Sequence, residues 1–422
     1  MRADVDVLVI GAGQAGLAVS HELDRAAVEH VVLERDRVGA TWADRWDSFR
    51  LVTPNHTIRL PGGEYSGTEP DGYLGRDEIG DHLRAYADSF AAPVEEGTAV
   101  ESLRRDADSA DSPGSAGSDG SGERDGSDVF IAETSTGRLR ARRVVVCTGA
   151  YQREHRPAVI DEIAREVPVI GATEYRSPAA TPGGTVLIVG GGQSGCQIAS
   201  ELVHAGREVV VAASRAPAMP RRVDGRDIAD WLIDLGFFDQ TLADMPSPAV
   251  RFASNPLATG AGGGHDLNLR TLAADGVRLI GHVTGVDGTR VAAADDLAES
   301  VAVGDGAFAE ICSAIGRLCA ARGLPVPGLP ELPATELTTA DPPDLADLGL
   351  VVNACGFRPA YDWIAIPGIV DDMGFPVQEN GASASVPGLF FAGVPWMRTR
   401  KSPLLLGVGE DAEIVVRQLA AR

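Results

Sequence analysis

Two glycine-rich segments constrain the fold of this 422-residue chain more than any other feature. Gly11-Ala-Gly-Gln-Ala-Gly16 follows an apolar run over 5–10, and Gly190-Gly-Gly-Gln-Ser-Gly195 follows another over 186–189. A stretch with helical spacing of apolar residues comes after each motif. In a βαβ unit that binds a dinucleotide, the first glycine permits a tight turn, the second lets the backbone approach a pyrophosphate, and the third lets the helix pack closely on the strand. The two copies therefore predict an α/β protein with two Rossmann-like dinucleotide-binding domains.

The residue that ends the second strand distinguishes the two units. Glu34 stands 23 residues after Gly11 and can accept hydrogen bonds from both ribose hydroxyls of an adenosine. The equivalent place in the second unit reads Ala213-Ser214-Arg215 and has no acid. Serine and arginine suit a 2′-phosphate, which a carboxylate would repel. We therefore interpret the first unit as an FAD site and the second as an NADPH site. A surface glutamate beside a tight turn and a solvated Arg215 are the alternatives.

The expected strands predict that the second domain is inserted in the first. Apolar, strand-like runs return late in the chain, at 350–353 and 389–392. We expect an FAD-binding domain over 1–177 and 340–422, and an NADP-binding domain over 178–339.

Two segments within these domains have a distinct character. Residues 224–330 are expected to form a partly helical insertion in the NADP-binding domain, with helical spacing at 227–235 and 296–322. Residues 107–128 are almost wholly Asp, Ser, Gly, Ala and Glu, and such a composition buries too little apolar surface to fold. We expect them to form a disordered acidic loop in the FAD-binding domain.

Charge and composition restrict the partners. The formal net charge is -23, which disfavours binding to nucleic acid and to anionic membranes. No apolar run approaches the ~20 residues that a membrane-spanning helix needs, and the N-terminal residues lack the pattern of a signal peptide. We expect a cytoplasmic protein with a small-molecule substrate, and a homodimer remains open. The five cysteines do not form a Cys-x-x-Cys pair, so neither a redox disulfide nor a metal site is predicted.

Beyond these features, the chain resembles the class B flavin-dependent monooxygenase superfamily over nearly its whole length. The likeness rests on five segments: the first glycine motif with Glu34, and residues 38–48, 144–149, 192–195 and 354–359. The closing stretch 396–411 is similar to that of a bacterial subgroup of these flavoproteins.

The resemblance implies positions for the cofactors. The residues expected to contact FAD are Gly11, Gly13, Gln14, Ala15, Gly16, Glu34, Arg35, Thr41, Trp42, Thr148, Gly149, Gly393, Leu405 and Leu406. Those expected to hold NADPH are Gly190, Gly192, Gln193, Ser194, Gly195 and Arg215. An asparagine after the Thr-Trp segment helps to stabilise the oxygenated flavin in this superfamily, and Asn55 is the candidate for that catalytic role; a turn asparagine after a proline is the alternative.

The implied function is that of an NADPH-dependent monooxygenase that uses O2. Through a flavin C4a-peroxide, one oxygen atom would enter a soft nitrogen or sulfur centre of a small substrate. Gly171 departs from the pattern, because related sequences have a histidine there, and the Baeyer–Villiger signature is absent. An NADPH-dependent oxidase or reductase without oxygen insertion, and a non-catalytic redox-sensing flavoprotein, are the alternative functions.

Overall fold

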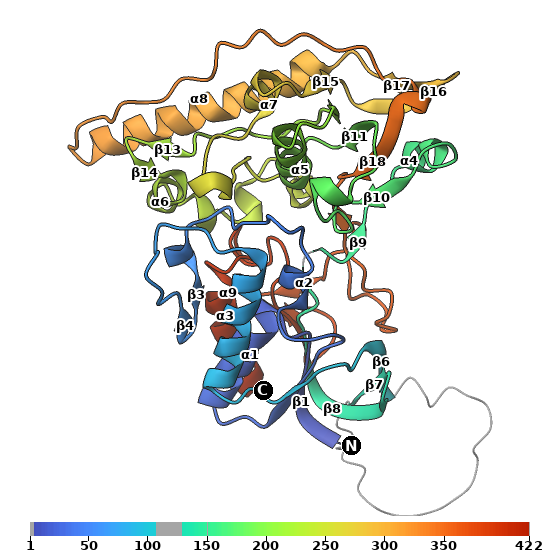
Figure 1. Ribbon diagram of the computed structural model, residues 1–422. Coiled ribbons are helices and arrows are strands. Elements are labelled where there is room, and N and C mark those ends of the chain that lie inside the picture. The colour runs from blue at the N-terminus through green and yellow to red at the C-terminus, as the bar shows by residue number, and fades with distance from the viewer. Residues whose placement is uncertain (1–3, 107–128, 150, 422) are drawn as a thin grey trace, which may run out of the picture.

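The computed structural model describes residues 4–106, 129–149 and 151–421, which form two lobes (Figure 1). Each lobe is built around one large β-sheet, and we call the lower lobe of Figure 1 the first domain and the upper lobe the second domain. The acidic loop expected over 107–128 lies outside the described residues. In the described ranges, no helix is long and apolar enough to cross a membrane.

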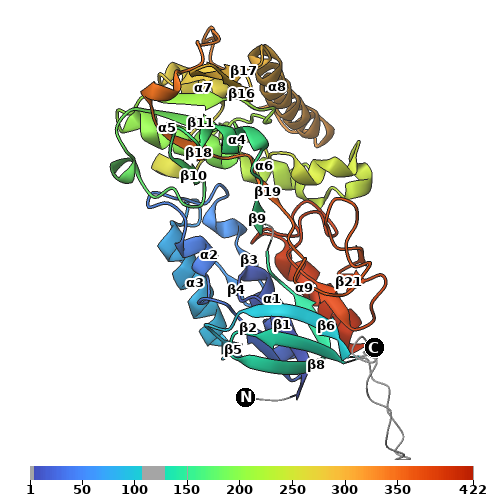
Figure 2. The ribbon, with the colours of Figure 1, turned by 90° about the vertical axis from the view of Figure 1, so that its right-hand side faces the viewer.

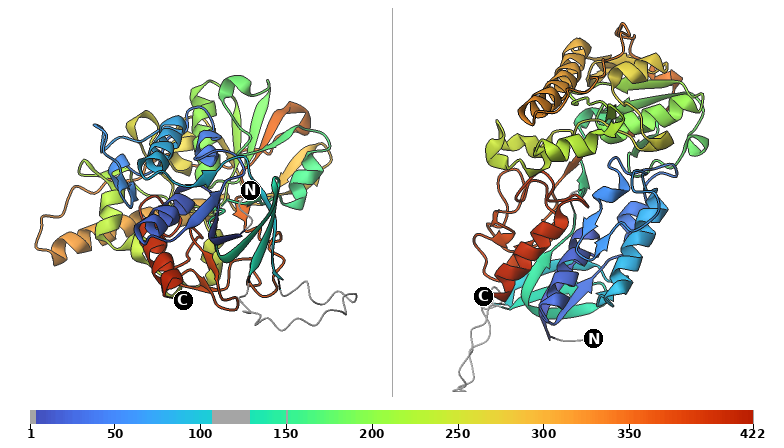
Figure 3. Two further views of the ribbon diagram at one scale, coloured as in Figure 1. Left: turned by 90° about the horizontal axis from the view of Figure 1, so that it is seen from below. Right: turned by 90° about the vertical axis from the view of Figure 1, so that its left-hand side faces the viewer.

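The first domain is built on a nine-stranded sheet with β1 (Asp4–Ile10) between β2 (His30–Leu33) and β8 (Gly137–Val146). Both pairings are parallel. The side chains of Val7, Leu8 and Val9 are fully buried, as expected for a strand that is covered on both faces. Helix α1 (Gln14–Arg25) follows the first glycine motif and packs against α9 (Val408–Ala420), so the two ends of the chain meet in one domain (Figure 3).

Shorter elements complete the first domain. The sheet also contains β5 (Val94–Glu95), β6 (Val100–Arg105), β7 (Phe130–Thr134), β20 (Gln378–Glu379), β21 (Ala382–Ser383) and β22 (Leu389–Phe391). Outside the sheet lie α2 (Ala40–Ala43), the hairpin of β3 (Arg59–Leu60) with β4 (Gly63–Glu64), and α3 (Arg76–Ser89), which packs against α1.

The second domain has a five-stranded parallel sheet in the order β10-β18-β11-β12-β15. The strands are β10 (Val169–Gly171), β11 (Thr185–Val189), β12 (Val209–Ala212), β15 (Arg278–Ile280) and β18 (Leu348–Asn353). The second glycine motif connects β11 to helix α5 (Gln193–His204), which confirms the expected βαβ unit.

Sheet membership differs from the expected division of the chain. Strands β10 and β18 belong to the second sheet, although they fall in the ranges 1–177 and 340–422 that were expected to form the first domain. Their apolar residues predict strands, but the choice of sheet depends on pairing partners far along the chain. Residues 224–330 are likewise not one insertion, because β15 joins the parallel sheet in the middle of that range and α7 (Leu269–Ala274) packs beside it.

The two helices expected within that range are confirmed. They are α6 (Ile228–Asp234), which begins after the capping side chain of Asp227, and α8 (Leu297–Ala321). The same part of the chain holds β13 (Arg222–Val223), β14 (Arg226–Asp227), β16 (Val283–Asp287) and β17 (Arg290–Ala293), and α4 (Ala158–Ile163) packs near β16.

The chain passes between the domains at two adjacent places. The short strand β9 (Arg153–Glu154) leaves the first domain, and β19 (Phe357–Arg358) returns to it. The two strands pair antiparallel, with Phe357 opposite Glu154, and lie between the lobes in Figure 2. The ends of the second domain are therefore close together.

Candidate functional site

A cavity of about 550 Å³ lies between the domains. Its walls come from the first glycine motif, the α2 segment, the stretch that precedes β9, residues 219–256 of the second domain, and residues 400–406. Segments that are far apart in the sequence thus meet at one internal surface.

The glycines of the first motif take three different roles. Gly11 has φ 101°, and a Cβ atom there would lie 2.6 Å from the carbonyl oxygen of Cys147. A Cβ atom on Gly16 would overlap the carbonyl oxygen of Gly11, so α1 contacts the turn directly. Gly13 lines the cavity and has nothing within 4 Å of its would-be Cβ atom. The free backbone at Gly13, at the N-terminus of α1, is a cradle that fits a pyrophosphate.

Glu34 both lines this cavity and holds the turn. Its Oε2 accepts a hydrogen bond of 2.7 Å from the Ala12 amide, and its Oε1 accepts one of 3.1 Å from the Asp36 amide. A carboxylate has about four lone-pair positions, so acceptor capacity remains for the hydroxyls of a ribose.

Gln14 joins three segments at the cavity wall. Its side-chain oxygen accepts a hydrogen bond of 3.0 Å from the Trp42 indole, and its amide nitrogen donates one of 3.1 Å to the carbonyl of Pro403. Gly393 approaches so closely that a Cβ atom would lie 2.6 Å from Cβ of Ala15. The structure brings together at this cavity all of the residues expected to contact FAD except Gly16, which packs behind the turn: Gly11, Gly13, Gln14, Ala15, Glu34, Arg35, Thr41, Trp42, Thr148, Gly149, Gly393, Leu405 and Leu406.

Asn55 does not lie at the cavity, contrary to the expected catalytic role. Its side chain is 1% exposed and donates a hydrogen bond of 2.8 Å to the carbonyl of Glu69. The side-chain oxygen accepts a hydrogen bond of 2.7 Å from the Leu74 amide. Both ends of the side-chain amide therefore hold the loop over 69–74. This is the structural role of a turn asparagine, which was the alternative to catalysis.

The second glycine motif repeats the same backbone geometry. Gly190 has φ 117°, and Cβ atoms on Gly190 and Gly195 would overlap the carbonyl oxygens of Ala354 and Gly190. Ser214 Oγ accepts a hydrogen bond of 3.0 Å from the Gly191 amide, which is the role that Glu34 plays in the first motif. Around the would-be Cβ atom of Gly192, only Ser254 lies within 4 Å, at 3.4 Å, so this turn also leaves room for phosphate.

The residues expected to hold NADPH lie at the carboxyl end of β11 and β12, outside the walls of the 550 Å³ cavity. Gln193 hydrogen bonds with both backbone groups of Ala258, so its side chain supports the adjacent loop. Arg215 forms an ion pair of 2.5 Å with Glu299, and both side chains are about two-thirds exposed. Exposed pairs of this kind contribute little stability, so the guanidinium can exchange partners.

At Gly171, a carboxylate fills the space that a side chain would take. A Cβ atom there would overlap the carboxylate of Glu154, which comes from the linker strand β9. Burial raises the pKa of Glu154. The histidine of related sequences would therefore require Glu154 to move.

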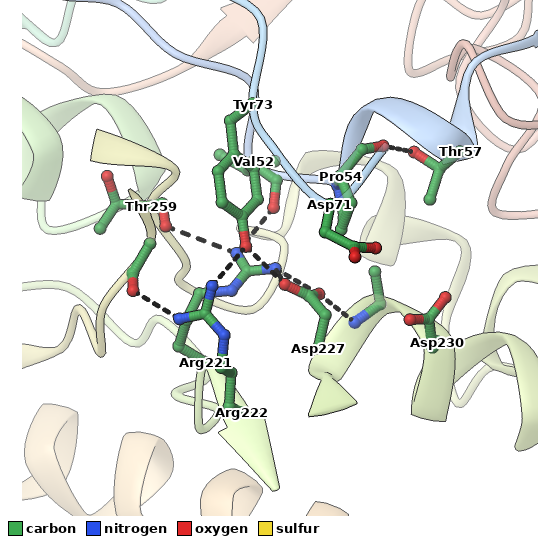
Figure 4. Close-up of polar contacts among 12 residues, drawn as sticks. Val52, Pro54, Thr57, Asp71, Tyr73, Arg221, Arg222, Asp227, Asp230 and Thr259 are labelled. Carbon is green, nitrogen blue, oxygen red and sulfur yellow. Dashed lines mark hydrogen bonds and ion pairs between the residues drawn. The ribbon is translucent and has the colours of Figure 1, made fainter. Parts of the chain in front are cut away.

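A cluster built around one buried ion pair connects the domains beside the cavity (Figure 4). Arg221 is 2% exposed, and its guanidinium binds the carboxylate of Asp227 and donates a hydrogen bond of 2.8 Å to the carbonyl of Val52. The ring of Tyr73 lies 5.0 Å from the guanidinium carbon, and its hydroxyl donates a hydrogen bond of 2.5 Å to Asp227. Asp227 also accepts the Ala229 amide and so caps α6. The cluster thereby fixes α6 against the first domain.

His56 makes a second connection to α6. Its Nε2 lies 2.8 Å from Asp230, and its Nδ1 lies 3.0 Å from the carbonyl of Pro70. Burial lowers the pKa of His56, but the hydrogen bonds and the charges of Asp230 and Asp71 outweigh it, and the net pKa is raised. The charged form of His56 is therefore favoured at this contact.

Several cavity residues were not singled out from the sequence. They are Arg45, Met219, Ile228, Leu232, Phe237, Phe238 and Arg400. Arg45 and Arg400 lie in segments that carry the family resemblance, but no spacing rule marks them. The apolar residues come from α6 and its flanks. The periodicity of this segment predicts a helix, but it does not predict what the helix packs against.

A two-domain protein with an FAD cradle and a second dinucleotide motif has the architecture of an FAD-dependent oxidoreductase. The sequence profile of the pyridine nucleotide-disulphide oxidoreductases matches residues 8–111 and 123–229, so the chain belongs to that family. It is an FAD-dependent oxidoreductase with FAD and a nicotinamide dinucleotide as cofactors. Its five cysteines are all unpaired in the structure.

Relatives and solved structures support the resemblance to flavin monooxygenases. The chain is 28% identical over 422 residues to the oxidoreductase CzcO-like protein of Geobacillus kaustophilus (strain HTA426), covering 99% of each chain. It is 28% identical over 245 residues, 54% of each chain, to the probable indole-3-pyruvate monooxygenase YUCCA8 of Arabidopsis thaliana. The flavin-containing monooxygenase from Stenotrophomonas maltophilia has the same fold, with a TM-score of 0.64, 21% identity and 99% coverage of both chains.

The roles of Gly16 and Gly13 predict different effects of their substitution by alanine, one on folding stability and one on FAD binding. Gly16→Ala should lower the free energy of unfolding by about 1–3 kcal/mol, because the methyl group meets backbone that cannot move away. Gly13→Ala should leave the apoprotein stable but weaken FAD binding roughly tenfold, because its methyl group enters the cradle. Denaturant unfolding of the apoprotein and FAD titration measure the two effects, and equal loss of stability in both variants would contradict this assignment.

The buried cluster predicts a large loss of stability when its charge balance is broken. Asp227→Asn keeps the helix cap but leaves the cation of Arg221 buried without its anion, which should cost about 3–5 kcal/mol. Asp234→Asn is the matched control on α6, because its pair with Arg226 is partly exposed and should contribute about 1 kcal/mol or less. Thermal and denaturant unfolding of the FAD-loaded protein would show whether the two variants differ.

Proposed function

We propose that the protein is an NADPH-dependent flavin monooxygenase that transfers one oxygen atom of O2 to a soft nitrogen or sulfur centre of a small substrate. The other oxygen atom leaves as water, and two electrons come from NADPH. The observation that carries the proposal is the continuity of the 550 Å³ cavity, which extends from the FAD cradle to an apolar compartment between the domains.

The chain's own residues position groups and exclude water in this proposal. When bound, FAD supplies the electron transfer and the activation of O2. Gly11, Gly13 and Glu34 hold the adenosine diphosphate part, and Gln14 fixes the closing segment over 403–406 against the cofactor site. The apolar side chains of Met219, Ile228, Leu232 and Phe238 keep water from the remaining space. Such chemistry requires few acid or base groups from the protein, and the relative named as an indole-3-pyruvate monooxygenase supports oxygen insertion.

NADPH is preferred over NADH in this proposal because Ser214 and Arg215 follow β12, at the place where an acid would select an unphosphorylated ribose. Arg215→Ala should raise the KM for NADPH roughly tenfold, because it removes a charge-assisted hydrogen bond to the 2′-phosphate. The KM for NADH should stay nearly unchanged, because NADH has no 2′-phosphate.

Glu299→Gln is the matched variant for this test, because it frees Arg215 from its ion pair. Its KM for NADPH should be equal to or below that of the wild type. Initial rates with both cofactors provide the measurement, and an equal effect of Arg215→Ala on NADPH and NADH would reject the role of Arg215.

An NADPH oxidase without oxygen insertion is the second candidate function. Glu154 fills the place where related sequences have a histidine at Gly171, and Asn55 holds a loop outside the cavity. Both observations remove groups that the resemblance associates with oxygenation.

Oxygen balance separates the two functions. The purified, FAD-loaded protein would be mixed with NADPH, ¹⁸O2 and aryl methyl sulfides or tertiary amines, and NADPH consumption, hydrogen peroxide and product would be quantified. A monooxygenase gives one ¹⁸O-labelled product molecule for each NADPH consumed. Hydrogen peroxide equal to the NADPH consumed, without labelled product, would identify an oxidase. Absence of NADPH consumption would reject both enzymes and leave the redox sensor.

A further inference from the structure

One end of the cavity is apolar and contains a single charge. We call this part the distal compartment; it is formed by those residues of 219–256 and 400–406 that line the cavity. Met219, Ile228, Leu232, Phe238 and Leu406 supply apolar walls, and Arg400 is the only charged side chain among the lining residues of these two ranges.

The Arg400 guanidinium is held by aromatic rings and a neutral amide. Its central carbon lies 4.0 Å from the ring centroid of Phe237 and 4.5 Å from that of Trp396. One terminal nitrogen donates a hydrogen bond of 3.1 Å to the side-chain oxygen of Gln240, and Nε is buried without a hydrogen-bond partner. Burial lowers the pKa of Arg400 to about 10, so the side chain remains charged at neutral pH.

The neighbouring cations are neutralised, unlike Arg400. Arg398 lies 2.7 Å from Asp411, and Lys401 lies 2.8 Å from Asp239 and 2.7 Å from Glu410. The nearby acid Asp244 binds the amide and hydroxyl of Thr241. Within the described ranges, Arg400 has no ion pair with a carboxylate. A partly buried cation without an anion is costly, so its retention beside a cavity indicates a ligand that supplies the negative charge.

We propose that Arg400 binds the carboxylate of an amphipathic substrate whose apolar body fills the distal compartment. This inference rests on the proposed function, because it identifies the substrate class of the same cavity. Arginine presents planar, paired donors that match a carboxylate. Phe237 and Trp396 lie close to the guanidinium, so its free edge suits a planar anion. One cation balances one negative charge, whereas a phosphate monoester would bring roughly two.

The test is a comparison of acids with their neutral amides. The oxidised, FAD-loaded protein would be titrated with 3-(phenylthio)propanoate and 3-(phenylthio)propanamide, and with shorter, longer and alkyl thioether pairs, while the flavin absorbance is recorded. In the wild type, at least one acid should bind 10-fold or more tightly than its amide, since one charge-assisted contact corresponds to about that ratio. Arg400→Met should abolish this preference, and Arg400→Lys should retain part of it.

Lys401→Gln is the matched control, because Lys401 carries the adjacent charge but does not line the cavity. It should keep the preference for the acid. Thermal unfolding and FAD content of each variant establish that it is folded, and the conservative Arg400→Lys variant provides the comparison if Arg400→Met is unstable.

Three results would overturn the proposal. The first is that no acid of the series binds to the wild type more tightly than its amide. The second is that the Arg400 variants retain the preference for the acid. The third is that Arg400→Met weakens NADP⁺ binding and leaves the acid preference unchanged, which would make Arg400 a cofactor residue. Binding is measured without turnover, so its outcome is separate from that of the oxygen-balance experiment. Acids that bind through Arg400 but yield no oxygenated product would disprove the proposed function alone.

Discussion

The ion pair between Arg221 and Asp227 supports one wall of the cavity. Asp227 caps α6, and α6 supplies part of the cavity wall. Arg221 binds the carbonyl of Val52 in the first domain, so the same guanidinium that neutralises the cap also fixes the helix to the opposite domain. Because the pair is buried, its strength depends on the exclusion of water by Tyr73 and the surrounding backbone. The apolar compartment is thus maintained by a polar contact at its edge.

The two glycine motifs share one hydrogen bond that supports the turn, and the residue that accepts it also differs in charge between the motifs. In each motif, a side chain just after the second strand accepts a hydrogen bond from an amide within the glycine turn, through Glu34 in one and Ser214 in the other. The turn is therefore supported whichever residue is present. This permits an acid in the first motif and a neutral hydroxyl in the second without changing the backbone, while the local charge differs by one.

The sequence was informative where function depends on neighbouring residues. The glycine spacing predicted both turns, and all but one of the residues expected at FAD line a single cavity. It was uninformative where the answer depends on distant partners. Strand β18 would have the same apolar character in either sheet. The sequence around Asn55 does not reveal that its side chain binds the backbone of Glu69 and Leu74. Arg400 is one of several cations in its segment, and only the structure shows which of them form ion pairs with carboxylates.

The position of the linker strands has a consequence for the order in which the protein is made. The chain leaves the first domain at β9 and returns at β19, and only afterwards does β22 pair with β8 and α9 pack against α1. During synthesis from the N-terminus, the second domain is complete before the first has its last parallel strand and its covering helix. Strand β7 pairs with residues 137–141 of β8, but residues 144–146 of the newly emerged β8 must wait, with one edge unpaired, for a strand that is translated some 240 residues later. Early folding of the second domain brings the two linkers together and so shortens the loop that the late strand has to close.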